Sequence, residues 1–215
     1  MAEDQLANLG AAGPFSATAL ATLKTRWDAA IDRHAALLDR RAQAGFVRHC
    51  HGDLHLRNIC LIDGQPVLFD AIEFSEPIAC IDVLYDLAFL LMDLTHRGLD
   101  RHAWAVFNRY VAATGDLDGL ALLPLYQSLR AAIRAHVGLS MAKAQPDAAE
   151  ARNLEDEAQA YLALALRLAA PAPVRLIAIG GLSGSGKSTL ARALAPGSAP
   201  CRGRFSFAAI RSASA

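Results

Sequence analysis

The sequence predicts an α/β fold that is mostly helical, and three observations support this. Four segments after Pro77 are rich in Ala and Leu and have the apolar spacing of amphipathic helices. Two short β-prone runs precede them, and a third, at 174–180, leads through a glycine-rich loop into helical sequence. The chain has 215 residues, 53% of them hydrophobic, so it can form one full domain and part of another.

The first predicted element is a long amphipathic helix from Ser16 to Arg41, where apolar residues recur at intervals of three and four. The runs "ICLID" at 59–63 and "PVLFD" at 66–70 follow, separated by Gly64 and Gln65. They predict a hairpin-like pair of strands. Four helices complete this part of the chain, at 81–96, 101–113, 122–143 and 148–168.

The C-terminal part of the chain differs in composition from the helical part before it, and it begins with "PAPVRLIAIGGLSGSGKSTLARALA". Its two prolines mark a linker, "VRLIAIG" has the composition of a buried parallel strand, and "KSTLARALA" is helical in pattern. We therefore divide the chain into a first domain at 1–170, a strand–loop–helix unit at 171–196, and a tail at 197–215 without periodicity.

Charge and cysteine content exclude some classes of binding partner and indicate the cellular compartment. Lys plus Arg and Asp plus Glu number 21 each, so there is no electrostatic footprint for nucleic acid or an anionic membrane. The four cysteines have no CxxC spacing, which disfavours a zinc ribbon or disulfide framework and favours a reducing compartment. No apolar run approaches the roughly 20 residues of a membrane-spanning helix. We expect a cytoplasmic protein without nucleic-acid or membrane partners.

The stretch "HGDLHLRN", residues 51–58, concentrates residues that carry chemistry, and Asp70 follows at the end of the predicted hairpin. Phosphoryl transfer from ATP requires a carboxylate that orients the attacking hydroxyl and accepts its proton. It also requires oxygen ligands for the Mg²⁺ that neutralises the phosphates. We expect Asp53 to meet the hydroxyl, and Asn58 and Asp70 to hold the Mg²⁺.

This stretch resembles the aminoglycoside phosphotransferase-like branch of the protein-kinase fold, whose catalytic loop has the pattern HGDxHxxN. The resemblance covers Val47 to about Leu168 and extends through "FDAIEF" and "DVLYDLAFLLMDL". It implies a protein-kinase-like C-lobe in which Asp53 is the catalytic base and His51 braces the loop. It also implies Asn58 and Asp70 as Mg²⁺ ligands, and a buried Asp86 that pins the loop backbone from the following helix.

A metal-dependent hydrolase is the alternative for the same stretch, because the pattern HxDxH also occurs in metallohydrolases. Its imagined zinc ligands would be His49, Cys50, His51 and His55. No second ligand cluster with metal spacing follows, because the later histidines fall on predicted helices. We give this alternative the smaller weight.

The second motif, "GLSGSGKS" at 181–188, satisfies the P-loop pattern between a β-prone run and a helix. Glycines let backbone amides surround phosphates, the lysine reaches the terminal phosphates, and the serine after it ligates Mg²⁺. A glycine turn of purely structural origin is the alternative. The predicted ATP-binding residues are Gly181, Ser183, Gly184, Ser185, Gly186, Lys187, Ser188 and Thr189, with Ser188 also a metal ligand.

Two phosphate-handling motifs in one chain resemble the bifunctional aminoglycoside phosphotransferase/ATP-binding family, in which a small P-loop kinase domain follows the phosphotransferase-like domain. An upper lobe with a glycine-rich loop and a strand lysine does not precede His51. Only 27 residues follow Ser188, too few for a P-loop kinase domain. We therefore expect a chain truncated at both ends, and a frameshifted reading after Pro196 is our hypothesis for the irregular tail.

The expected function is ATP-dependent phosphoryl transfer to a small-molecule hydroxyl acceptor, impaired in this chain by the missing lobe. The alternatives are a non-catalytic nucleotide-binding fragment and an inactive gene remnant. For the acceptor, the predicted helix at 122–143 offers Tyr126, Arg130 and Arg134 on neighbouring turns. These side chains would contact an anionic substrate, pair with acids on adjacent helices or lie along a solvated face.

Overall fold

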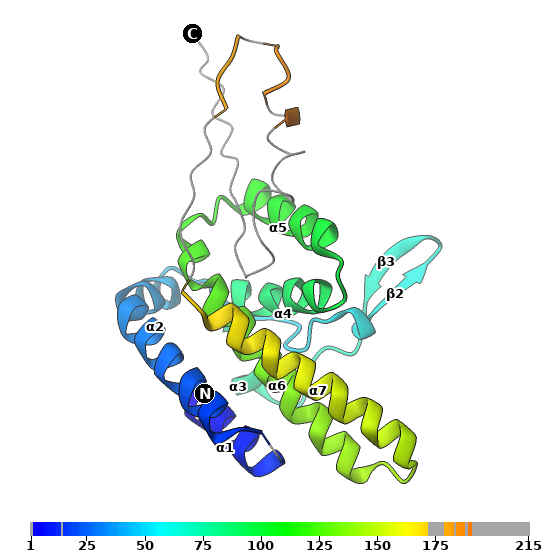
Figure 1. The fold of residues 1–215 in the computed structure, drawn as a ribbon. Helices are drawn as coiled ribbons and strands as arrows, with labels where there is room; N and C mark the ends of the chain where they lie inside the picture. Colours follow the sequence, from blue (N-terminus) through cyan, green and yellow to red (C-terminus); the bar gives the residue numbers. More distant parts are fainter. Residues whose placement is uncertain (1, 14, 172–178, 183, 188, 191–215) are drawn as a thin grey trace.

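The computed structural model describes residues 2–13, 15–171, 179–182, 184–187 and 189–190, which form helices and two small antiparallel sheets (Figure 1). This confirms the mostly helical α/β class. In chain order the elements are α1 (Ala2–Ala12), α2 (Ala17–Gln43), β1 (Val47–His49), η1 (Leu56–Asn58), β2 (Ile59–Ile62), β3 (Gln65–Leu68), α3 (Glu76–Ala79), β4 (Cys80–Asp82), α4 (Val83–His96), α5 (Asp100–Thr114), η2 (Asp118–Leu122), α6 (Leu123–Ala144) and α7 (Ala148–Ala169).

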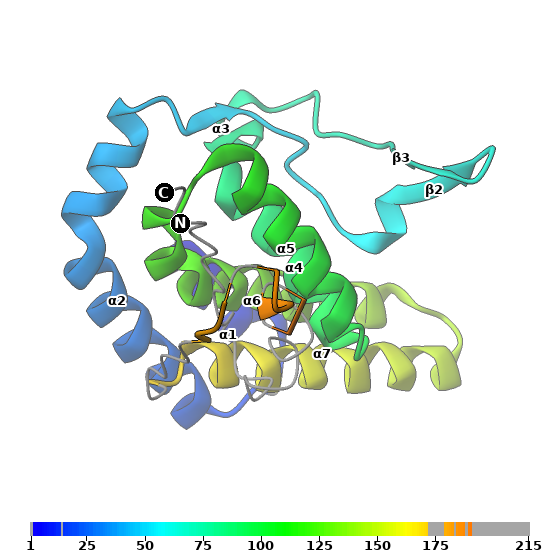
Figure 2. The same ribbon diagram turned by 90° about the horizontal axis from the view of Figure 1, so that it is seen from above.

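The helical body is built around α4 and α6. Helix α6 packs along α7 and against α4, while α5 covers another side of α4. Seen from above, α2 and α7 border this body on two sides and the β2–β3 hairpin extends beyond it (Figure 2). Ten residues of α4 are buried, so any acid within it must find a partner in the interior.

The predicted hairpin is confirmed, with β2 pairing antiparallel to β3 from Ile59 opposite Leu68 to Ile62 opposite Gln65. Its turn differs by one residue from the sequence expectation. Asp63 and Gly64 have φ values of 51° and 75°, which is the left-handed pair that a two-residue hairpin turn requires. Gln65, expected in the turn, therefore belongs to the second strand.

A second, two-stranded sheet was not expected from the sequence. Strand β1 pairs antiparallel with β4, with Val47 opposite Asp82 and His49 opposite Cys80. Because Cys80–Asp82 pair in this sheet, the following helix begins at Val83 rather than at Ile81 as predicted. The Asp82 carboxylate caps that helix by accepting the Leu84 backbone N–H at 2.8 Å.

A buried cluster of charges joins α2 to the start of α4. Arg41 is 3% exposed and donates hydrogen bonds of 2.6–2.9 Å to both carboxylate oxygens of Asp82 and of Asp116. Tyr126 donates to Asp82 at 3.2 Å and Tyr110 donates to Asp116 at 2.6 Å. Every acid of the cluster is therefore met by donors, which fixes the long helix against the body.

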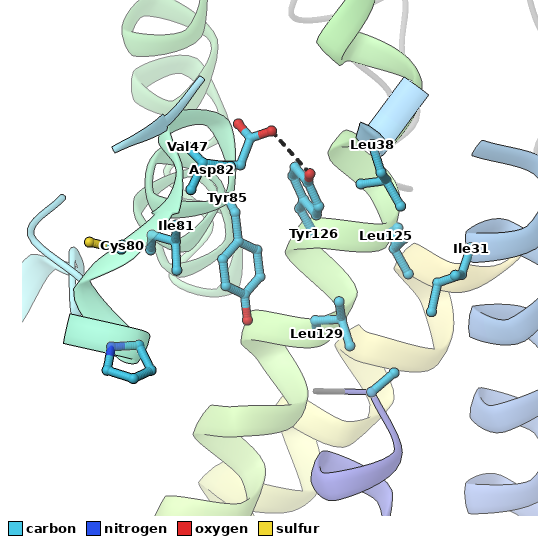
Figure 3. Close-up of a pocket in the computed structure, with 12 residues that line it drawn as sticks. Ile31, Leu38, Val47, Cys80, Ile81, Asp82, Tyr85, Leu125, Tyr126 and Leu129 are labelled. Carbon is cyan, nitrogen blue, oxygen red and sulfur yellow. Dashed lines mark hydrogen bonds between the residues drawn. The ribbon is translucent and has the colours of Figure 1, made fainter. Parts of the chain in front are cut away.

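A cavity of about 350 Å³ lies between α2, β4 and α6 (Figure 3). Its lining is mostly apolar and includes Ile31, Leu38, Ile81, Leu125 and Leu129, with the bonded hydroxyl of Tyr126 at one side. None of the residues from 51 to 58 lines it. In the part of the chain that the structure describes, no helix has the length and apolar character needed to cross a membrane.

Candidate active site

The loop between β1 and β2 is closed by a contact between Asp53 and Asn58. The Asn58 Nδ2 donates to the Asp53 carboxylate at 3.0 Å and to the Asp53 backbone carbonyl at 3.0 Å. Both N–H groups of the Asn58 amide are thereby hydrogen-bonded, so its side-chain oxygen remains available as a metal ligand. Asn58 is 7% exposed, whereas the Asp53 side chain is 39% exposed and remains accessible to a substrate.

His55 holds the Asp53 carboxylate from the buried side. The backbone N–H of Arg57 donates to His55 Nδ1 at 3.2 Å, so we assign the proton of the neutral ring to Nε2. That nitrogen lies 3.2 Å from Asp53 Oδ2 and donates to it. Burial raises the pKa of Asp53, but the hydrogen bonds from His55 and Asn58 and the positive charge of Arg134 outweigh it and lower that pKa.

The segment that carries Asp70 is tied to the catalytic loop on both sides of that residue. Before it, Phe69 donates its N–H to the Asn58 carbonyl at 3.1 Å, and its own carbonyl accepts from His51 Nε2 at 2.9 Å. After it, Ile72 donates its N–H to the His51 carbonyl at 2.9 Å. Asp70 itself has a left-handed φ of 61° and an exposed side chain. His51 therefore lies between the loop and the Asp70 segment.

Gly52 allows these two segments to approach closely. Its φ is 81°, and a Cβ there would lie 3.1 Å from the Ile72 side chain. The left-handed backbone conformation therefore favours glycine at this position, and a larger residue would also have to displace Ile72.

Two buried acids of α4 hold the loop backbone on either side of Asp53. The Asp86 carboxylate accepts the N–H groups of His51 and Gly52, each at 3.0 Å, and Asp93 accepts the Leu56 N–H at 3.0 Å. The two acids are seven residues apart and so lie on one face of the helix. The sequence predicts a role for Asp86 but not for Asp93. Two acids spaced by two turns in an otherwise apolar helix are the signal that could have identified Asp93.

Arg130 supplies the positive charge of this buried region. It donates to the carbonyls of Gly52 at 3.1 Å and Tyr85 at 3.2 Å, and its Nη2 lies 3.7 Å from Asp86. Burial lowers the pKa of Arg130 and raises the pKa of Asp86. Arg130 thus pairs with an acid on an adjacent helix, and Tyr126 is likewise bonded to Asp82, which are the contacts that the pairing alternative predicts.

The geometry disfavours the zinc alternative. Both ring nitrogens of His55 have partners, and His51 Nε2 is bonded to a carbonyl. Within the described ranges, no three His, Cys, Asp or Glu side chains are grouped so that they could hold a metal ion. A Mg²⁺ site here would therefore depend on Asn58, Asp70 and phosphate oxygens, which fits the few protein ligands that Mg²⁺ usually takes.

The structure describes part of the P-loop sequence. Gly184 and Gly186 have left-handed φ values of 75° and 78°, and Lys187 Nζ donates to the Leu182 carbonyl at 2.5 Å. Thr189 is helical and exposed. Ser183, Ser188, most of the predicted strand, the end of the helix and the tail at 197–215 lie outside the described residues.

Comparison with known proteins places these features in a family. The model of the phosphotransferase enzyme family matches residues 4–123, a range that contains the Asp53 loop, the hairpin, the Asp70 segment and α4. The uncharacterized proteins Rv2004c of Mycobacterium tuberculosis and Mb2027c of Mycobacterium bovis are each 33% identical over 169 residues. That alignment covers 78% of this chain and 33% of each relative, so the chain spans about a third of their length. No solved structure shows a significant match. By the extent of the family match, the chain belongs to the phosphotransferase enzyme family.

Proposed function

We propose that this chain carries the catalytic loop of an ATP-dependent phosphotransferase that acts on a hydroxyl group of a small molecule. The observation that carries the proposal is the contact between Asp53 and Asn58, next to an Asp70 segment that is bonded to the same loop on both sides. Family membership supports ATP as the phosphoryl donor. We further propose that residues 1–170 form a protein-kinase-like C-lobe.

Asp53 would act on the acceptor hydroxyl. Its carboxylate is partly exposed and is kept anionic by His55, so it can accept a hydrogen bond from a hydroxyl and hold it in line with a phosphoryl group. Because the pKa of Asp53 is lowered, the carboxylate would first orient the hydroxyl. It would take the proton only as the bond from the hydroxyl oxygen to the γ-phosphorus of ATP forms and the bond from that phosphorus to the oxygen of the leaving ADP breaks.

The Asn58 oxygen and the Asp70 carboxylate would hold Mg²⁺ together with the phosphates. The bound ion neutralises the phosphate charge during transfer. His51 keeps these two ligands in register, because its ring bonds to Phe69 and its backbone carbonyl bonds to Ile72.

We propose a separate nucleotide site at the P-loop sequence, supported by the left-handed glycines before Lys187. With two sites, one nucleotide-binding step should be lost in Lys187→Ala but kept in Asp70→Asn, and this step would be assigned to the P-loop motif; the step that remains in Lys187→Ala would belong to the Asp70 site. A P-loop kinase domain in the longer protein, and hence a bifunctional enzyme, is part of this proposal.

The direct test compares two aspartates with the same backbone conformation. Asp70 and Asp63 both have left-handed φ values and exposed side chains, and Asn tolerates that conformation. In the full chain carrying Lys187→Ala, we expect Asp70→Asn to abolish Mg²⁺-dependent ATP binding, measured by calorimetry, while Asp63→Asn leaves it unchanged. Equal binding in both variants would refute the assigned ligand role of Asp70.

A further inference from the structure

A second arginine of α6 lies beside the catalytic loop. Arg130 reaches the Gly52 carbonyl from this helix, and Arg134 follows one turn later on the same face. The positive charge of Arg134 contributes to the lowered pKa of Asp53. Unlike Arg130, Arg134 is only half-buried.

Tyr161 of α7 supports the Arg134 side chain. The guanidinium carbon lies 5.6 Å from the centre of the Tyr161 ring, and His96 stacks on that ring at 3.7 Å with an angle of 16°. The Tyr161 hydroxyl donates to Asp93 at 2.9 Å, so the ring is anchored to the acid that holds the loop at Leu56. Arg134 therefore rests on a fixed surface rather than extending into solvent.

The neighbouring acids are already paired with other groups. Asp93 accepts from Tyr161 and lies 3.3 Å from Arg97, and Glu157 lies 3.6 Å from Arg57. In the part of the chain that the structure describes, no carboxylate lies within 4.0 Å of the Arg134 guanidinium. Among the described residues, this half-buried cation over Tyr161 thus has no carboxylate partner within 4.0 Å.

We propose that Arg134 binds an anionic group of the acceptor, so that the substrate is an alcohol that also bears a phosphate or carboxylate. This inference rests on the proposed phosphotransferase function. A guanidinium presents paired donors that match the oxygens of either group, and its restricted position lowers the cost of binding. An acceptor that carries several positive charges would be repelled from the same place.

The test measures anion binding without nucleotide. In the full chain carrying Lys187→Ala, which removes the P-loop lysine, we would titrate glycerol 3-phosphate, glycerate and glycerol and follow backbone amide signals by NMR. We expect one or both anions, but not glycerol, to shift signals near Asp53 and Arg134. Comparison of the two anions tells whether phosphate or carboxylate is the preferred group.

Two variants identify the residue responsible. Arg134→Gln should weaken binding of the preferred anion about tenfold or more, because a charged hydrogen-bonding partner is lost. Arg134→Lys, which keeps the charge but not the paired donors, should weaken it less. Arg109→Gln, the same change at an exposed position of α5, should alter the affinity less than about twofold.

Three results would overturn the inference: no anion binding, binding equal to that of glycerol, or equal affinity in Arg134→Gln and its parent. Because no nucleotide is present, the outcome does not depend on the proposed ATP site. Loss of the Asp70 effect on ATP binding would contradict the proposed function and leave the anion result standing.

Discussion

The molecule contains two buried clusters that each combine an arginine with acidic side chains. The two clusters differ in the groups with which the acids form hydrogen bonds. Around Arg41, the side chains of Asp82 and Asp116 pair with the guanidinium through four hydrogen bonds. Around Arg130, the acid Asp86 accepts two backbone N–H groups of the catalytic loop instead. In this second cluster one guanidinium nitrogen of Arg130 and His51 Nδ1 are buried without a hydrogen-bond partner in the described chain.

The Arg41 cluster holds helices together, whereas the Arg130 cluster shapes the catalytic loop. A buried arginine with two bidentate acids contributes mainly to holding its elements in place, although replacing such a group by apolar residues can be neutral. Asp86 accepts two loop N–H groups, Arg130 donates to the loop carbonyl of Gly52 and to the Tyr85 carbonyl of α4, and the two side chains are 3.7 Å apart. Changes in the first cluster should therefore affect stability, whereas changes in the second should also affect the loop.

The largest effect is expected from breaking the Arg41 cluster. Arg41→Ala leaves Asp82 and Asp116 buried without their cation, so the free energy of unfolding should fall by about 3–5 kcal/mol. Urea denaturation followed by circular dichroism measures this. The neighbouring Arg40 is exposed, and Arg40→Ala should change the free energy by less than about 0.5 kcal/mol. Similar losses in the two variants would show that the cluster does not hold the fold.

A smaller loss of stability with a local signature is expected for Asp86→Asn. The Asn amide accepts the two loop N–H groups less well than the carboxylate does, and it leaves the charge of Arg130 uncompensated. We therefore expect the free energy of unfolding to fall by about 2–3 kcal/mol. Amide hydrogen exchange of His51 and Gly52 should accelerate more than that of the α6–α7 interface. The exposed Asp156→Asn is the matched control. Uniform acceleration throughout the chain would contradict a local role.

The two clusters should respond oppositely to acid. Burial raises the pKa of Asp116, but hydrogen bonds from Arg41 and Tyr110 outweigh it, so its folded-state pKa lies below the usual value of 3.8. Its stabilisation is present above pH 3.8 and is lost as the pH falls through the lowered pKa.

The pKa of Asp86 is instead raised by burial. The folded protein therefore loses stability as the pH rises from the usual value of 3.8 through the raised pKa. Unfolding free energies measured from pH 6 to 3 should fall less steeply for Asp116→Asn than for the wild type and more steeply for Asp86→Asn. The same slope in all three proteins would refute this assignment.

The smallest effect is expected at the edge of the first cluster. Tyr126→Phe removes one hydrogen bond to Asp82 but leaves both bonds from Arg41, so the loss should be about 1 kcal/mol. Thermal unfolding measures it, and nucleotide binding should be unchanged. A loss as large as that of Arg41→Ala would mean that the tyrosine, rather than the arginine, organises the cluster.

The sequence by itself determined the elements whose pattern is local. The structure places the long helix, the hairpin and the four later helices close to their predicted positions. The spacing of apolar residues, every 3.6 residues in a helix and every second residue in a strand, depends only on neighbours in the sequence. The spacing of "HGDLHLRN" likewise indicated that Asp53 and Asn58 act together, and the structure places them in contact. The family match supports the same motif.

Only the tertiary structure decided which distant residues meet. The pairing of β1 with β4, the role of Asp93 and the partner of Arg130 depend on segments far apart in the chain. The sequence left Arg130 and Arg134 equivalent, one turn apart on the same helix. Packing buried the first against Asp86 and left the second half-buried over the Tyr161 ring, because the partner of a charge is set by the surface that each helix faces.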